Sequence, residues 1–116
     1  MKKNNLVYLD DMNNAIGDIR AYVKGVKLNE FLDNKMMQDA VIRNLEIIGE
    51  SANRLTDNFV DANPDFPISQ AVSMRNLLIH EYNIVNLYDI WDTIKKDLPI
   101  LRKQLMKAVK KEKDVV

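Results

Sequence analysis

One short run of the chain holds the residues best suited to chemistry near neutral pH. His80 is the only histidine among 116 residues, and Arg75 lies five positions before it. Imidazole is the side chain whose ordinary pKa is closest to neutral pH, so a reaction that needs a titrating imidazole has one candidate. The planar guanidinium of an arginine suits the charge that develops on a phosphoryl group. The pair predicts phosphate chemistry, and the absence of cysteine excludes thiol catalysis and thiolate metal sites.

Length and composition indicate a single helical domain over residues 1–116. The chain is long enough for one hydrophobic core, 47% of its residues are apolar, and only three glycines and three prolines interrupt it. Its first five residues are polar and no apolar run approaches the length of a membrane span. We therefore expect a soluble cytoplasmic protein without a membrane partner.

The net charge is zero, but basic residues concentrate near the C-terminus. Residues 95–114 contain eight lysines and arginines against three acidic residues, so this segment carries +5 and residues 1–94 carry −5. A basic tail of this kind attracts nucleic acid. The alternative is a solvated last helix whose lysines complement the C-terminal end of its dipole. Composition alone favours the second interpretation.

Apolar residues recur at three- and four-residue steps throughout, which predicts an all-α antiparallel bundle of four to five helices. The first predicted helix carries Leu6 to Val23 and ends near Gly25, and a link containing Phe31 and Leu32 follows. The second carries Met37 to Leu55 after a cap at Asp33 or Asn34, and the third covers about Ile68 to Tyr82 after Pro67. A fourth helix starts near Leu87, with Asn86 as its cap, and Pro99 breaks or kinks it before a last helix that reaches Val109.

On its predicted helix, the motif divides between two faces. At about 100° per residue, Arg75 and Tyr82 share the apolar stripe, whereas His80 lies about 140° away from Arg75. A charge on an apolar face needs a counter-ion, either a carboxylate or a phosphate. Asn76 and His80 are four residues apart and can touch. For Arg75 and His80 to meet one substrate, Arg75 must reach along the surface or the helix must distort. A second possibility is that a partner subunit supplies the other half of the site.

The second helix offers two carboxylates, Glu46 and Glu50, that could neutralise Arg75 or polarise His80. The competing interpretation is an ordinary exposed face with Asp39–Arg43 and Arg43–Glu46 ion pairs. The small residues Gly49 and Ala52 permit another helix to approach closely, either within the bundle or in a dimer.

With these residues laid out, the chain resembles the HepT-like family of HEPN proteins. The family's Arg-x4-His-x-Tyr motif reads here as Arg75, His80 and Tyr82, with the asparagine that commonly follows the arginine at Asn76. The segments 38–50, Trp91-Asp92 and 97–101 resemble its second- and fourth-helix signatures, in the same order. One departure is Ile68, where the family usually has tryptophan after the proline.

The resemblance implies a metal-independent endoribonuclease toxin that needs no cofactor and works as a homodimer. His80 would be the general acid or base, Arg75 would stabilise phosphoryl charge, and Asn76 would orient His80 or contact phosphate. RNA would supply its own 2′-OH nucleophile, leaving a 2′,3′-cyclic phosphate and a 5′-OH. The expected antitoxin is an MntA-type nucleotidyltransferase that transfers AMP to Tyr82. The alternative is a catalytically silent HEPN subunit that only binds a nucleotidyltransferase partner or a nucleotide.

Overall fold

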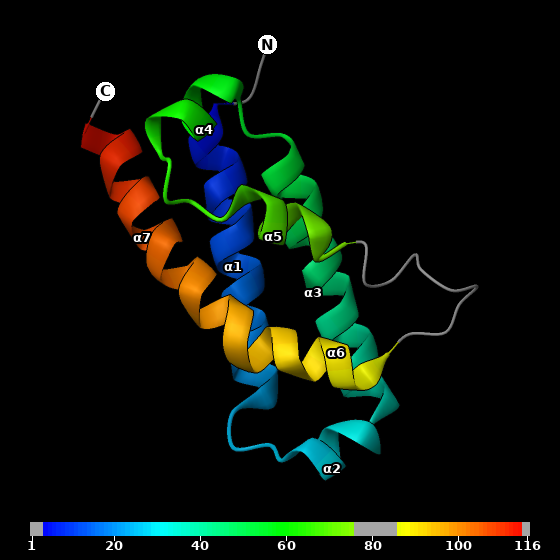
Figure 1. The fold of residues 1–116 in the computed structure, drawn as a ribbon. Coiled ribbons are helices and arrows are strands. Elements are labelled where there is room, and N and C mark those ends of the chain that lie inside the picture. Colours follow the sequence, from blue (N-terminus) through cyan, green and yellow to red (C-terminus); the bar gives the residue numbers. More distant parts are fainter. Residues whose placement is uncertain (1–3, 76–85, 115–116) are drawn as a thin grey trace.

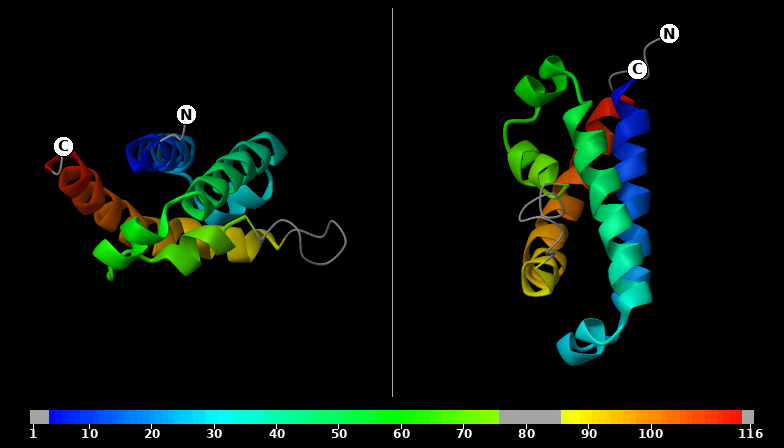
Figure 2. Two further views of the ribbon diagram at one scale, coloured as in Figure 1. Left: turned by 90° about the horizontal axis from the view of Figure 1, so that it is seen from above. Right: turned by 90° about the vertical axis from the view of Figure 1, so that its right-hand side faces the viewer.

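A computed structural model describes residues 4–75 and 86–114, and these ranges contain helices and no strand. Two long antiparallel helices, α1 (Asn5–Val23) and α3 (Lys35–Asn53), lie side by side and form the frame of the fold (Figure 1). The remaining helices cover one side of this pair (Figure 2). The prediction of an all-α fold is confirmed. Within the two described ranges, no helix is both long and apolar enough to cross a membrane.

Asparagine caps begin both long helices, and a glycine follows the end of the first. The Asn34 side chain accepts a hydrogen bond from the backbone N–H of Met37 and starts α3, so Asn34 rather than Asp33 is the cap. Asn4 starts α1 in the same way. Just after α1, Gly25 has a φ of 72°, a conformation that favours glycine and ends the helix. The cap at Asn34 and the end near Gly25 were predicted from local signals, whereas the cap at Asn4 was not.

The predicted link around Phe31 is wrong, because the chain forms a short helix there, α2 (Leu28–Leu32). Phe31 is fully buried, and its ring centroid lies 5.2 Å from that of Trp91. The Gln38 side chain donates hydrogen bonds to the carbonyls of Phe31 and Leu32, at 2.9 and 3.1 Å. A helix this short is marginal alone and is stabilised by packing and capping, which have no periodic signature in the sequence.

Two further short helices connect the frame to the motif. Helix α4 (Asp57–Ala62) was not predicted, and α5 (Ile68–Ser73) is the described start of the predicted third helix. Thr56 caps α4 and also exchanges hydrogen bonds with Asn5 of α1, which holds this end of the molecule together. The predicted continuation of the third helix to Tyr82 lies outside the described residues.

The fourth helix is not broken at its proline. Helix α6 (Leu87–Asp92) continues through a π-helical turn, η2 (Thr93–Asp97), into α7 (Leu98–Asp114). The backbone N–H of Leu98 donates to the carbonyl of Thr93, a five-residue step. Proline lacks an N–H and its ring crowds the preceding turn of an α-helix. A π turn immediately before Pro99 changes the hydrogen-bond register at this point, so the helix accommodates the proline instead of ending.

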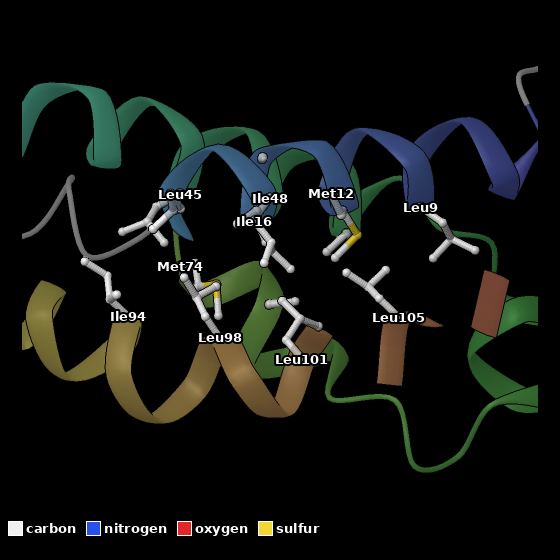
Figure 3. Packing of buried hydrophobic residues seen from close by; sticks show 14 of the residues in the cluster. Leu9, Met12, Ile16, Leu45, Ile48, Met74, Ile94, Leu98, Leu101 and Leu105 are labelled. Atoms are coloured by element: carbon white, nitrogen blue, oxygen red, sulfur yellow. The ribbon is translucent and has the colours of Figure 1, made fainter. Parts of the chain in front are cut away.

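A single apolar cluster fills the space between the α1–α3 pair and the α6–η2–α7 run (Figure 3). Each long element contributes one buried stripe to it. Members that Figure 3 labels are Leu9, Met12 and Ile16 from α1, Leu45 and Ile48 from α3, Met74 next to α5, and Ile94, Leu98, Leu101 and Leu105 from η2 and α7.

Candidate active site

The motif begins where α5 leaves the core. Ala71 is fully buried and Met74 is nearly so, whereas the next residue, Arg75, is half-buried. The backbone N–H of Arg75 donates to the carbonyl of Val72 at 3.4 Å, so Arg75 still belongs to the last turn that follows α5. Burial of its neighbours holds the Arg75 backbone in place while part of its side chain reaches the surface.

Gly49 of α3 allows the backbone at Arg75 to pack unusually close to α3. A Cβ atom at position 49 would lie 2.7 Å from Cβ of Arg75, 2.8 Å from its backbone nitrogen and 3.0 Å from the carbonyl oxygen of Val72. Real side chains essentially never approach so closely, and none of these atoms is at the end of a flexible chain. Only glycine therefore permits this contact, and the small residue expected to allow close helix approach does so between α3 and α5.

The carboxylates of α3 divide between two sides of that helix. Glu46, three residues before Gly49, shares its face, while Glu50 lines a pocket with Tyr8 of α1 and Arg54. Neither carboxylate lies within ion-pair distance of the Arg75 guanidinium. The structure therefore does not support the possibility that one of them neutralises Arg75, and the possibility that one polarises His80 involves a residue outside the described ranges.

The polar face of α3 was expected to carry two surface ion pairs, and one of them forms as predicted. Glu46 pairs with Arg43 at 3.7 Å, as predicted. Asp39 pairs with Lys35 at 3.2 Å, where the sequence analysis expected Arg43. Lys35 and Arg43 each lie one helical turn from Asp39, and Lys35, with 84% of its side chain exposed, has the freedom to donate to the Asp39 carboxylate.

The other three motif residues, Asn76, His80 and Tyr82, lie outside the described residues. Their roles therefore stay predictions. The chain is described again from Asn86, whose side chain accepts hydrogen bonds from the N–H groups of Tyr88 and Asp89 and caps α6, as predicted. Ile90 of α6 is fully buried. The motif segment is thus attached to the core at both ends, through Met74 on one side and Ile90 on the other.

The remaining signature residues are structural. Trp91 packs against Phe31, and the Lys95 ammonium lies 4.7 Å from the centre of the Trp91 ring, within the range of a cation–π interaction. Asp92 pairs with Lys96 at 3.8 Å on the same exposed surface. The Trp91–Phe31 contact attaches α6 to α2, whereas the two charged contacts lie within the α6–η2 segment.

Comparison with known proteins is consistent with this geometry. The family model described as Ribonuclease HepT-like matches residues 12–108. A Thermococcus cleftensis protein with the name "Probable ribonuclease HepT" is 36% identical over 110 residues, covering 95% of this chain and 100% of its own. A Methanocaldococcus jannaschii protein with the name "Putative RNase" is 35% identical over 104 residues, covering 90% and 95% of the two chains. No solved structure gives a significant match.

Proposed function

Because the chain belongs to the ribonuclease HepT-like family, we propose that it is a metal-independent endoribonuclease, the toxin of a toxin–antitoxin pair. The observation that carries the proposal is the complete motif Arg75-x4-His80-x-Tyr82 within the matched region. The names of two similar proteins, a probable ribonuclease HepT and an RNase, support the substrate class. The expected place of action is the cytoplasm, where RNA is exposed to the protein.

The chemistry follows from what RNA brings to the reaction. The ribose 2′-OH attacks the adjacent phosphorus, the bond to the 5′ oxygen of the next nucleotide breaks, and a 2′,3′-cyclic phosphate and a 5′-OH result. His80 takes the proton from the 2′-OH or returns one to the leaving oxygen. Arg75 stabilises the charge on the phosphoryl oxygens, and Asn76 orients His80 or contacts the phosphate. The close approach of Gly49 to the backbone and Cβ of Arg75 supports this role, because it fixes the point from which the guanidinium reaches toward the phosphate.

A homodimer completes the proposed site. Each chain contains a single histidine, whereas the reaction needs both an acid and a base. Two motifs facing one cleft would supply two histidines and two arginines. The half-buried Arg75, with no carboxylate of α3 in ion-pair distance, suits a cleft that receives a phosphate.

Cleavage of RNA in the presence of a chelator tests the proposal. Purified protein and a labelled single-stranded RNA in excess EDTA should give discrete fragments, and their 3′ ends should be cyclic phosphates that resist phosphatase until acid opens them. Fragments that vanish on chelation would contradict the metal-independent mechanism. Intact RNA under all conditions would contradict the enzyme and favour a silent subunit that binds a nucleotidyltransferase.

The proposed partner is an MntA-type nucleotidyltransferase that silences the site by AMPylation of Tyr82. Tyr82 is seven residues after Arg75, so on a continuous helix the two share one face. AMP attached there would place an anion and a base where the RNA phosphate is expected. Co-expression with the neighbouring nucleotidyltransferase should raise the intact mass by one or more AMP units, and Tyr82→Phe should abolish the increase. An adduct that persists in Tyr82→Phe would place the modification elsewhere.

A further inference from the structure

A basic pocket lies away from α5, between the end of α1 and the junction of η2 with α7. Its volume is about 590 Å³. Four cationic side chains line it: Arg20 and Lys24 at the end of α1, Lys95 of η2 and Arg102 of α7. Val23, Ile94 and Leu98 provide apolar lining between them. None of its lining residues belongs to α5, so this pocket is separate from the surface at Arg75.

Within the part of the chain that the structure describes, no acidic side chain lines the pocket. Among the residues described, no carboxylate lies within ion-pair distance of any of its four cations, although three other ion pairs form on the surface. Arg20 and Lys24 have an ordinary role at the negative end of the α1 dipole. That role does not apply to Lys95 and Arg102, which lie well inside the continuous α6–η2–α7 run. Two separate helices therefore bring like charges together, which is unfavourable unless an anion joins them.

We propose that this pocket binds phosphate groups of the RNA substrate, outside the Arg75–His80 motif. Two guanidinium groups provide planar forks for phosphate oxygens, and two ammonium groups add point charges. The apolar lining is suited to a ribose or base beside each phosphate. The inference rests on the proposed ribonuclease function, since it assigns to the same substrate a second contact that positions the strand.

The cation–π contact makes Lys95 a well-oriented member of the site. Its ammonium lies 4.7 Å from the centre of the Trp91 ring, and Trp91 is itself packed on the buried Phe31. A lysine side chain held in this way loses less rotamer freedom when it binds an anion than a free surface lysine does. Lys95 of η2 is therefore better prepared to bind an anion than the exposed lysines of α7 are.

A matched pair of double variants tests the proposal. In full-length protein carrying His80→Ala, so that RNA stays intact, Lys24→Gln with Lys95→Gln removes two charges from the pocket. Lys103→Gln with Lys110→Gln removes two from exposed positions of α7 that line no pocket described here. Fluorescence anisotropy with a labelled single-stranded RNA should show about tenfold weaker binding for the pocket variant and less than twofold for the control. The slope of log K against log salt should fall by about 1.4 for two lost phosphate contacts.

Three comparisons make the outcome decisive. Equal affinity of the two double variants would overturn the proposal. AMP and inorganic phosphate are tested as competitors of the labelled RNA. A site that binds an RNA strand is displaced weakly by either, because its affinity depends on several linked phosphates, whereas a mononucleotide site is displaced by AMP. An oligoglutamate peptide should compete poorly with RNA. If it competes as strongly as unlabelled RNA does, and if this competition disappears in the pocket variant, the pocket binds an acidic protein and the proposal is overturned.

Effects on folding and on catalysis are measured separately from RNA affinity. All four replaced lysines are exposed, so the control variant should melt at the same temperature as its parent, whereas the pocket variant also loses the contact of Lys95 with Trp91. If the pocket variant melts at a lower temperature, Arg20→Gln with Arg102→Gln repeats the test without disturbing that contact. If protein with His80 intact cleaves no RNA, the ribonuclease proposal fails. The affinity difference between the two double variants would still report on the pocket.

Discussion

Replacing His80 with alanine is expected to lower the rate of RNA cleavage by roughly two to four orders of magnitude. No other histidine exists in the chain to take over proton transfer. The measurement is the single-turnover cleavage rate of a labelled RNA, with wild-type and variant protein matched for thermal unfolding temperature. In cells, expression of wild-type protein alone should arrest growth, and His80→Ala should not.

Tyr82→Phe is the matched control for this experiment, because it changes the motif without removing a proposed catalytic group. It should cleave RNA at nearly the wild-type rate while losing the AMP acceptor. A His80→Ala protein that cleaves as fast as Tyr82→Phe would contradict the assigned acid–base role. Equal growth with wild-type protein and His80→Ala would contradict the toxin assignment.

Mixing the two subunits tests whether one cleft uses two histidines. Wild-type and His80→Ala subunits are mixed in equal amounts and allowed to exchange. If subunits pair at random, about a quarter of the dimers carry two intact motifs and about half carry one. A shared cleft that needs both histidines predicts about a quarter of the wild-type activity. Independent sites predict about half, which would contradict the shared cleft.

Replacing Gly49 with alanine should destabilise the fold and impair cleavage together. The added methyl group would meet the Cβ and backbone nitrogen of Arg75 at 2.7 and 2.8 Å, so α3 and α5 must move apart. Overpacking of this kind costs about 1–3 kcal/mol of unfolding free energy. The same displacement moves Arg75, and a shift of about 1 Å at a positioning group can cost on the order of 100-fold in rate. Chemical denaturation and single-turnover cleavage measure the two effects.

Gly17→Ala is a matched control within the same chain. Gly17 is an exposed residue inside α1, and no atom lies within 4 Å of the position its Cβ would occupy. Alanine there should stabilise the protein by about 0.5–1 kcal/mol, because glycine loses more backbone freedom in a helix. Cleavage should be unchanged. If Gly49→Ala were as stable and as active as Gly17→Ala, the close contact with Arg75 would contribute neither to stability nor to cleavage.

Local features of the sequence were sufficient for much of the fold. Asn34 and Asn86 cap helices where predicted, and the apolar stripes of α1 and α3 face the core. These features depend on residues within one or two turns of each other, so each can be recognised in a short window. The motif Arg75, His80 and Tyr82 was equally evident, because its spacing lies within eight residues.

Features that depend on distant residues were missed. Helix α2 forms because Phe31 packs on Trp91, sixty positions away, and its five residues carry no periodic signal. Pro99 was expected to break or kink its helix; the run from α6 to α7 does not break, and the π turn at Thr93–Asp97 just before the proline was not predicted. For α2, packing with a distant element overrides the local preference of the chain.

By itself, the sequence therefore determined the helical class, most helix limits and the family motif, since these depend on neighbouring residues. Only the tertiary structure decided that Gly49 fixes Arg75, that Glu46 and Glu50 do not pair with it, and that Arg20 and Lys24 join Lys95 and Arg102 around one pocket. The physical reason is that close approach and summed charge arise between side chains from different helices. Their separation in space is set by the packing of the whole core and is not expressed in any short stretch of sequence.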